Sequence, residues 1–91
     1  MENNSAIIDG VIEHIFDEKN VAQNFNIREF VINTGGQYPQ TIICQLTNSR
    51  CDLIIGKRVG DKVLAHVNLR GRKIQGPKYF NQIDCWKLEK I

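Results

Sequence analysis

Residues 61–73 read DKVLAHVNLRGRK and contain the clearest alternation of apolar and polar residues in the chain. Val63, Ala65, Val67 and Leu69 alternate with Lys62, Leu64, His66, Asn68 and Arg70, which is the period of a half-buried β-strand. We therefore expect one strand here, with an apolar face directed inward and a polar, partly basic face directed outward.

The same period recurs on both sides of this stretch, and β-branched and aromatic residues are frequent there. Strands are predicted over residues 6–16, 25–33, 40–46, 61–73 and 79–89. Gly10 lies inside the first of them, where a glycine indicates a bulge or a sharp coil of the strand.

The connections carry turn residues or polar runs. Residues 17–24 are polar and are predicted to form a loop, whereas TGGQYP at 34–39 predicts a turn. The segment 47–60 is either a loop or contains one short helical turn near 50–55. QGPK at 75–78 predicts the turn between the last two strands.

This order of elements predicts an all-β fold. Five strands, a coiled first strand and at most one short helix between strands three and four are typical of the OB-fold, a five-stranded Greek-key barrel. An SH3-like barrel is the alternative, but its strands are usually shorter and it lacks that helix. With 91 residues, the chain should form a single OB-fold domain over 1–91. Because so small a domain leaves much surface uncovered, we expect a homo-oligomer, a dimer or larger.

Several functional classes find no support in the sequence. No apolar run approaches the ~18 residues of a membrane helix, and the first residues lack the pattern of a signal peptide, so we expect a cytoplasmic protein without a membrane partner. Cys44, Cys51 and Cys85 have no zinc-site spacing, which predicts reduced thiols and no metal. His14 and His66 lie near no nucleophile motif, and no phosphate-binding glycine loop occurs. We therefore predict neither an enzyme nor a cofactor.

The charge is unevenly distributed along the chain. Residues 1–49 contain two basic and six acidic residues, a net charge of −4, whereas residues 50–91 contain ten basic and four acidic residues, a net charge of +6. Such an asymmetry is a hint of a polyanionic partner. Arg70 and Arg72 share a strand face, with Lys73 and Lys78 on the loop beside them, so this row could follow phosphates. The other interpretation is that these basic residues form a solvated strand edge without a function in binding.

Aromatic residues strengthen the first interpretation. Tyr79 and Phe80 are consecutive in a strand and must point to opposite faces, so one of them should be exposed. If Ile83 and Cys85 are core residues, Phe80 and Trp86 point outward unless a bulge changes the register. An exposed ring can stack on a base, although Trp86 could equally cover an oligomer interface. Arg28 and Phe30 share a face of the second predicted strand, 25–33, and form a second candidate pair of cation and ring for nucleic-acid binding.

The motifs GDKVLAHVNLRGRKIQG and YFNQIDCWKLEKI resemble strands four and five of bacterial single-stranded DNA-binding proteins. The matching positions are Gly60, Val63, Ala65, Leu69, Arg72, Ile83 and Cys85. The set REFVI, QYPQTI, CDLI, VGDKV, LRGR, YFN and CWKLE also resembles a largely uncharacterised family of small OB-fold proteins from bacteria and phages. The resemblance implies the OB-fold and DNA binding. The tryptophans that the DNA-binding family uses for stacking have no counterparts on strands two and three here.

We therefore predict a non-catalytic protein that binds single-stranded nucleic acid, DNA in the first place, with little sequence preference. The alternative is a protein-interaction or oligomerisation module with the same fold and no nucleic-acid role. The residues predicted to bind nucleic acid are Arg28, Phe30, Arg70, Arg72, Lys73, Lys78, Tyr79 and Trp86.

Overall fold

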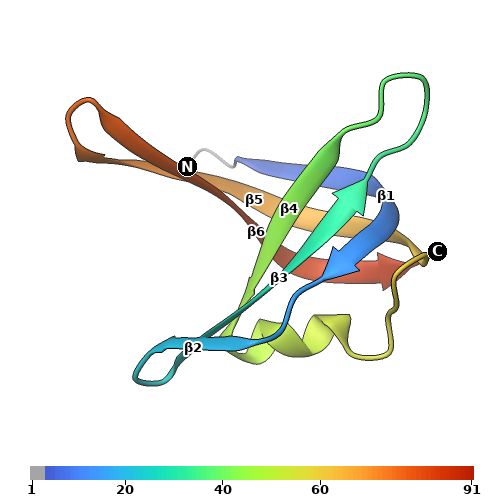
Figure 1. Cartoon of the computed structure of the whole chain (residues 1–91), viewed down its shortest axis with the longest axis horizontal. Helices are drawn as coiled ribbons and strands as arrows, with labels where there is room; N and C mark the ends of the chain where they lie inside the picture. The colour runs from blue at the N-terminus through green and yellow to red at the C-terminus, as the bar shows by residue number, and fades with distance from the viewer. Residues whose placement is uncertain (1–3) are drawn as a thin grey trace.

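The computed structural model describes residues 4–91, which form six β-strands and one short 3-10 helix. The elements are β1 (Ser5–Ile15), β2 (Lys19–Ala22), β3 (Phe25–Asn33), β4 (Thr41–Thr47), the helix η1 (Asn48–Ile54), β5 (Lys62–Gln75) and β6 (Lys78–Lys90). The predicted alternating strand is β5, and the five predicted strands are all present. The short helix follows β4, between the third and fourth predicted strands (Figure 1).

Five of these strands form a closed ring. The sheet order is β1-β5-β6-β4-β3-β2, and an additional pairing between β1 and β3 closes it. β1 pairs with β5 over Ser5–Val11 and then with β3 over Val11–Ile15, so it passes from one side of the barrel to the other. β2 lies outside the ring and pairs only with β3.

Gly10 lies where β1 changes partners. A Cβ atom on Gly10 would lie 2.4 Å from the carbonyl oxygen of Asn33, so only glycine lets the two backbones approach this closely. The predicted coiling of the first strand is confirmed. The register shift of β1 lies between Ile12 and His14, rather than at the glycine itself.

The barrel interior is filled by the alternating face of β5 and its neighbours. Val63, Ala65 and Val67 are fully buried, as predicted from the alternation. The buried set also contains Ile12, Phe30, Ile32, Cys44, Leu46, Cys51, Ile54, Cys85 and Leu88.

Helix η1 contributes two of these residues to the core, Cys51 and Ile54. The thiol of Cys51 lies 3.5 Å from the carbonyl oxygen of Leu46, the residue just before the end of β4. The uncertain segment 47–60 thus contains the short helix that the OB-fold order predicts. No helix within residues 4–91 has the length and apolar character needed to cross a bilayer.

The loop predicted over residues 17–24 is wrong in part, because β2 occupies Lys19–Ala22. A tight turn follows, in which Asn24 adopts φ of 58°, a left-handed conformation that asparagine tolerates. Every side chain of β2 is exposed, so the strand has no apolar alternation that sequence analysis could detect.

Candidate nucleic-acid interface

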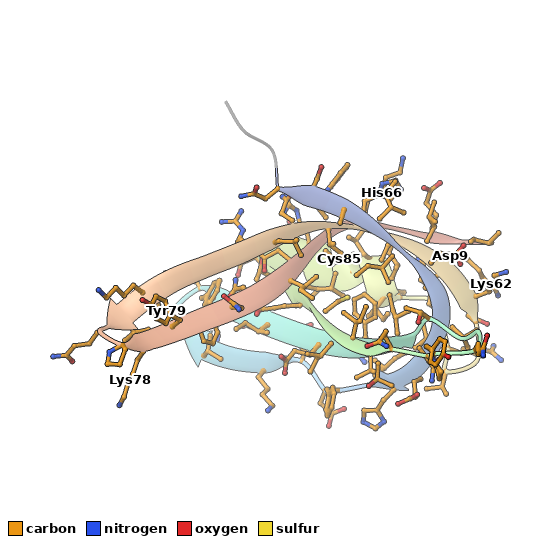
Figure 2. The ribbon with its side chains drawn as sticks, turned by 90° about the horizontal axis from the view of Figure 1, so that it is seen from above. Asp9, Lys62, His66, Lys78, Tyr79 and Cys85 are labelled. Carbon is orange, nitrogen blue, oxygen red and sulfur yellow. The ribbon has the colours of Figure 1, made fainter. Side chains whose placement is uncertain are left out.

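β5 and β6 extend beyond the barrel as a two-stranded ribbon, which we call the arm (residues 69–83). Its strands pair from Leu69 opposite Ile83 to Gln75 opposite Lys78. β4 pairs with β6 only at Asp84, where the arm begins. Figure 1 shows the arm projecting from the barrel, and Figure 2 shows Lys78 and Tyr79 near its tip.

The arm has two faces because residues directly opposite each other in an antiparallel pair point to the same side. The inner face continues the line of buried residues from the barrel and contains the pairs Leu69–Ile83, Gly71–Asn81 and Lys73–Tyr79. The outer face contains the pairs Arg70–Gln82 and Arg72–Phe80. The basic residues are therefore distributed over both faces, and not gathered on the single face that Arg70 and Arg72 share.

The rings at the end of the arm are both accessible. Tyr79 is 69% exposed and Phe80 is 45% exposed, on opposite faces as predicted from their adjacency. Tyr79 lies on the same face as the buried Cys85, but it is exposed because the arm extends past the end of the barrel.

The cations of the arm differ in their surroundings. Arg70 forms an ion pair with Asp84, with Nε 2.6 Å from Oδ2, and Gln82 donates a hydrogen bond of 3.0 Å to the other carboxylate oxygen. Arg70 is therefore already neutralised, although its side chain is exposed. Arg72 lies over the ring of Phe80, with Cζ 6.0 Å from the centroid, at the limit of a cation–π contact. Within residues 4–91, neither Arg72 nor Lys73 nor Lys78 takes part in an ion pair.

The prediction that Phe30 receives a base is wrong. Phe30 is fully buried, because its face of β3 points into the barrel, where it pairs with the buried Cys44. Arg28 shares that face, and its Nε donates a hydrogen bond of 2.9 Å to the carbonyl oxygen of Phe16. Arg28 thus lies on β3 beside the segment that leads into β2, and not on the arm.

Trp86 lies on the barrel rather than on the arm. It is the extra residue of a β-bulge, since His66 pairs with Lys87 and Val67 pairs with Cys85. The bulge leaves Trp86 outward and 40% exposed. It lies six positions after Phe80 in β6, about 20 Å along a strand.

His66 lies beside Trp86 on the outer barrel surface, and Ile7 lies beyond His66 on the neighbouring strand β1. The ring of His66 lies 5.3 Å from the indole, and Ile7, opposite His66 on β1, is 61% exposed. We call Ile7, His66 and Trp86 the Trp86 patch. His66 Nε2 lies 2.8 Å from Oε1 of Glu89, and this hydrogen bond, with the charge of Lys87, lowers the pKa of Glu89. Sequence analysis missed Ile7, because its neighbours depend on the register of β1 against β5.

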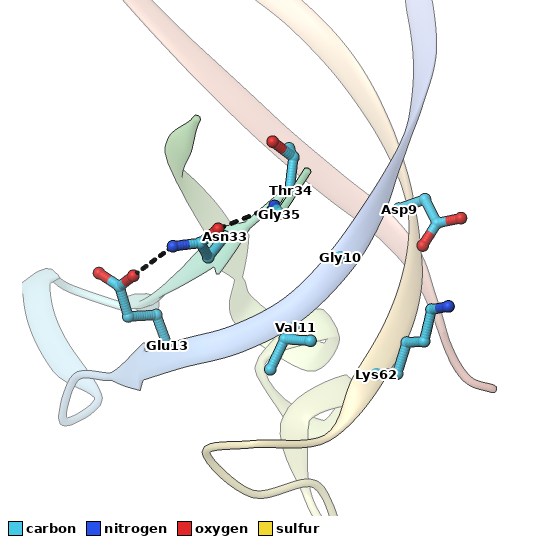
Figure 3. A pocket seen from close by; sticks show the side chains of 8 residues that line it. All are labelled: Asp9, Gly10, Val11, Glu13, Asn33, Thr34, Gly35 and Lys62. Carbon is cyan, nitrogen blue, oxygen red and sulfur yellow. Dashed lines mark hydrogen bonds between the residues drawn. The ribbon is translucent and has the colours of Figure 1, made fainter. Parts of the chain in front are cut away.

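A depression of about 740 Å³ lies at the opposite end of the barrel from the arm (Figure 3). Its side chains include Asp9, Glu13 and Lys62, and Asn33 donates a hydrogen bond of 3.0 Å to Glu13. Figure 2 shows Asp9 and Lys62 far from the tip of the arm. Two carboxylates against one ammonium group make this end a poor place for phosphates.

The three thiols are buried in the core. Burial raises the pKa of Cys44 to about 12 and that of Cys85 to about 11, and it raises the pKa of Cys51 as well. At neutral pH these thiols are protonated and therefore poor nucleophiles. The residues that the structure describes contain no cluster of three or more side chains suited to a metal ion.

Comparison with known proteins agrees with this architecture. A family model described as "Domain of unknown function (DUF3127)" matches residues 7–89. No curated protein matches the chain significantly.

Among solved structures, the mitochondrial single-stranded DNA-binding protein Rim1 of S. cerevisiae is similar with a TM-score of 0.81 and 13% identity, over 99% of this chain and 97% of that one. The SSB domain of a Synechococcus sp. protein has a TM-score of 0.76 and 15% identity, over 98% and 97%. The N-terminal domain of PriB from Thermoanaerobacter tencongensis, described as dimeric, has a TM-score of 0.74 and 13% identity, over 99% and 98%. At such identities the likeness shows the fold, which confirms the predicted OB-fold.

Proposed function

The chain belongs to the DUF3127 family, a domain of unknown function, and from that premise and its OB-fold we propose that it binds single-stranded nucleic acid, DNA first of all, without catalysis. The single observation that carries the proposal is the arm, which places cations without an ion-pair partner among residues 4–91 beside accessible rings. The DNA-binding proteins that share the fold give it further support. We expect the protein to act in the cytoplasm.

In this proposal the phosphates contact Arg72, Lys73 and Lys78, because these cations have no carboxylate partner among residues 4–91. Arg70 contributes less, since a phosphate would have to compete with Asp84 for its guanidinium group. Its main role is to link β5 to β6 at the root of the arm.

The bases stack on Tyr79 and Phe80, one on each face of the arm. Stacking of this kind contributes about 1–3 kcal/mol per base and is tolerant of sequence, because every base has a flat face. Binding by stacking and phosphate pairing should therefore extend to most single strands.

A fluorescence titration with labelled oligo-dT tests the proposal. Three phosphate contacts predict a slope of about −2 in log affinity against log salt for a single strand, or about 20-fold weaker binding at 200 mM than at 50 mM salt. The same titration with oligo-U compares DNA with RNA. Absence of binding, or binding that is independent of salt, would contradict the proposal.

We also propose that the protein forms a homo-oligomer, at least a dimer, through the Trp86 patch. The exposed apolar surface of Ile7 and Trp86 supports this, and so does the dimeric state described for the PriB domain. This assigns Trp86 to an interface between copies and leaves the arm to nucleic acid, so the two functions use different surfaces. A pure interaction module without nucleic-acid binding is the alternative.

Trp86→Ala is expected to weaken self-association at least about 30-fold, since buried tryptophans are frequent hot spots worth ~2 kcal/mol or more. Sedimentation velocity over a range of concentrations measures the effect. Tyr79→Ala is the matched control, because it removes an exposed ring from the arm and should leave the mass unchanged. A wild-type protein that stays monomeric at high concentration, or a Trp86 variant that keeps its mass, would refute this interface.

A further inference from the structure

The outer surface of β1, β3 and β4 carries a row of apolar side chains that is open to solvent. His14, Val31 and Ile43 lie directly opposite one another across the three strands. The ring of Phe16 extends the row on its β1 side, with its centroid 4.4 Å from that of His14. Because Phe16 and Ile43 are exposed, nothing within residues 4–91 buries this row.

The charged side chains beside the row are negative. Glu29 lies two residues before Val31 on β3, and its carbonyl oxygen accepts a hydrogen bond of 2.9 Å from the backbone of Phe16. Neither Glu13 nor Glu29 forms an ion pair within residues 4–91. β1, β3 and β4 contain a single basic residue, Arg28, which lies on the opposite face of β3. We define the β3 face as His14, Phe16, Glu29, Val31 and Ile43.

The chemistry of this surface excludes one kind of ligand and suits another. The corresponding face binds oligonucleotides in many OB-folds, but a face without cations is a poor surface for phosphates. Apolar side chains beside a free carboxylate instead suit a partner that presents a cation next to a ring.

The outer face of the arm presents this pair of groups. Arg72 and Phe80 lie directly opposite each other there, with Cζ of Arg72 6.0 Å from the ring centroid. On the β3 face, Glu29 and Val31 are about 7 Å apart along the strand. A ring packed on Val31 would therefore leave the adjacent guanidinium group within reach of Glu29. Figure 1 shows the arm projecting away from β3, so the arm that meets this face has to come from another molecule.

We propose that the arm of one copy of this chain docks on the β3 face of a second copy, with Phe80 on the apolar row and Arg72 paired with Glu29. The contact joins two different surfaces and is distinct from the Trp86 patch. Tyr79 lies on the inner face of the arm and takes no part in it. Docking requires no nucleic acid, but Arg72 cannot contact Glu29 and a phosphate together, so the two uses of one arm exclude each other.

The first test uses Trp86→Ala, so that the Trp86 patch makes no contribution to self-association. Sedimentation velocity over a range of protein concentrations should show reversible association at about 20 mM salt. Raising the salt to about 300 mM should weaken this association at least about tenfold, because exposed ion pairs are screened.

Charge reversal in the same background locates the contact. Glu29→Lys and Arg72→Glu should each weaken association at least about tenfold at low salt, because each places like charges against one another. The chain with both substitutions exchanges the two charges and should recover an affinity within about threefold of the Trp86→Ala parent. Arg58→Glu is the matched control, since it makes the same charge change in an exposed loop outside the arm and should leave association within about twofold.

Circular dichroism verifies that each variant is folded. Recovery in the doubly substituted chain supports the contact, because loss of fold or a change in net charge could not produce it. The proposal is refuted if Trp86→Ala stays monomeric at low salt, which would leave the β3 face to a basic partner other than the arm. It is equally refuted if either single reversal keeps full association, or if the double substitution fails to restore it.

Discussion

Replacing Arg72, Lys73 and Lys78 together by alanine is expected to weaken oligo-dT binding about 100-fold at 50 mM salt. Each cation removed eliminates one phosphate contact and the counterions that this contact releases, so the salt slope should also fall from about −2 toward zero. All three side chains are exposed and lie on the arm, outside the barrel core, so the free energy of unfolding should change little. The titration and a urea denaturation curve measure the two effects.

A control variant with the same loss of charge separates local contacts from net charge. Arg58, Lys62 and Lys90 are exposed and lie at the end of the barrel opposite the arm, near the start of β5 and the end of β6. Their replacement by alanine should weaken binding only a few-fold, through the long-range field. An equal loss of affinity in both triple variants would show that the arm is not the binding surface.

Phe30→Ala is expected to lower the free energy of unfolding by about 3–5 kcal/mol, the usual cost of truncating a buried phenylalanine. Phe30 is fully buried among core residues that include Ile32 and Cys44, so the substitution removes apolar contacts and leaves a cavity. A domain of this size has a total stability of roughly 5–15 kcal/mol, so the loss is a large fraction of the whole. Urea denaturation followed by circular dichroism gives the value.

The same variant tests the correction to the predicted site. Under conditions where Phe30→Ala remains folded, its affinity for oligo-dT should match that of the wild type, because the buried ring does not contact the bound oligonucleotide. Tyr79→Ala should behave in the opposite way, with stability changed by less than about 0.5 kcal/mol and affinity reduced at least about fivefold. A stable Phe30 variant with strongly reduced affinity would restore Phe30 as a binding residue.

The fold could be predicted from the sequence largely because β5 has an unambiguous period. Val63, Ala65 and Val67 alternate cleanly, and the structure buries all three. Leu69 continues the same pattern but is 50% exposed, because the alternation of a strand does not reveal where the barrel that covers it ends. β2 was missed for a related reason, since a strand exposed on both faces carries no apolar pattern.

The site could be predicted only in part, because its geometry depends on pairing between strands. The opposite orientations of Tyr79 and Phe80 follow from the chain alone and are confirmed. Phe30 could not be placed because both faces of its strand mix apolar and polar residues, so the alternation did not identify the inner face. The ion pair between Arg70 and Asp84 joins diagonal positions of two strands, and the register that creates it is not visible in the sequence.

The most direct test of the account is to map where a single strand contacts the protein. Backbone amide NMR spectra of the ¹⁵N-labelled 91-residue chain can be recorded as oligo-dT is added. The account predicts that the largest shifts occur in the arm, from Arg70 to Phe80, with small changes at the end of the barrel that contains Asp9 and Lys62. Saturating binding with shifts confined to the Trp86 patch or to that far end, and an arm whose spectrum does not change, would contradict it.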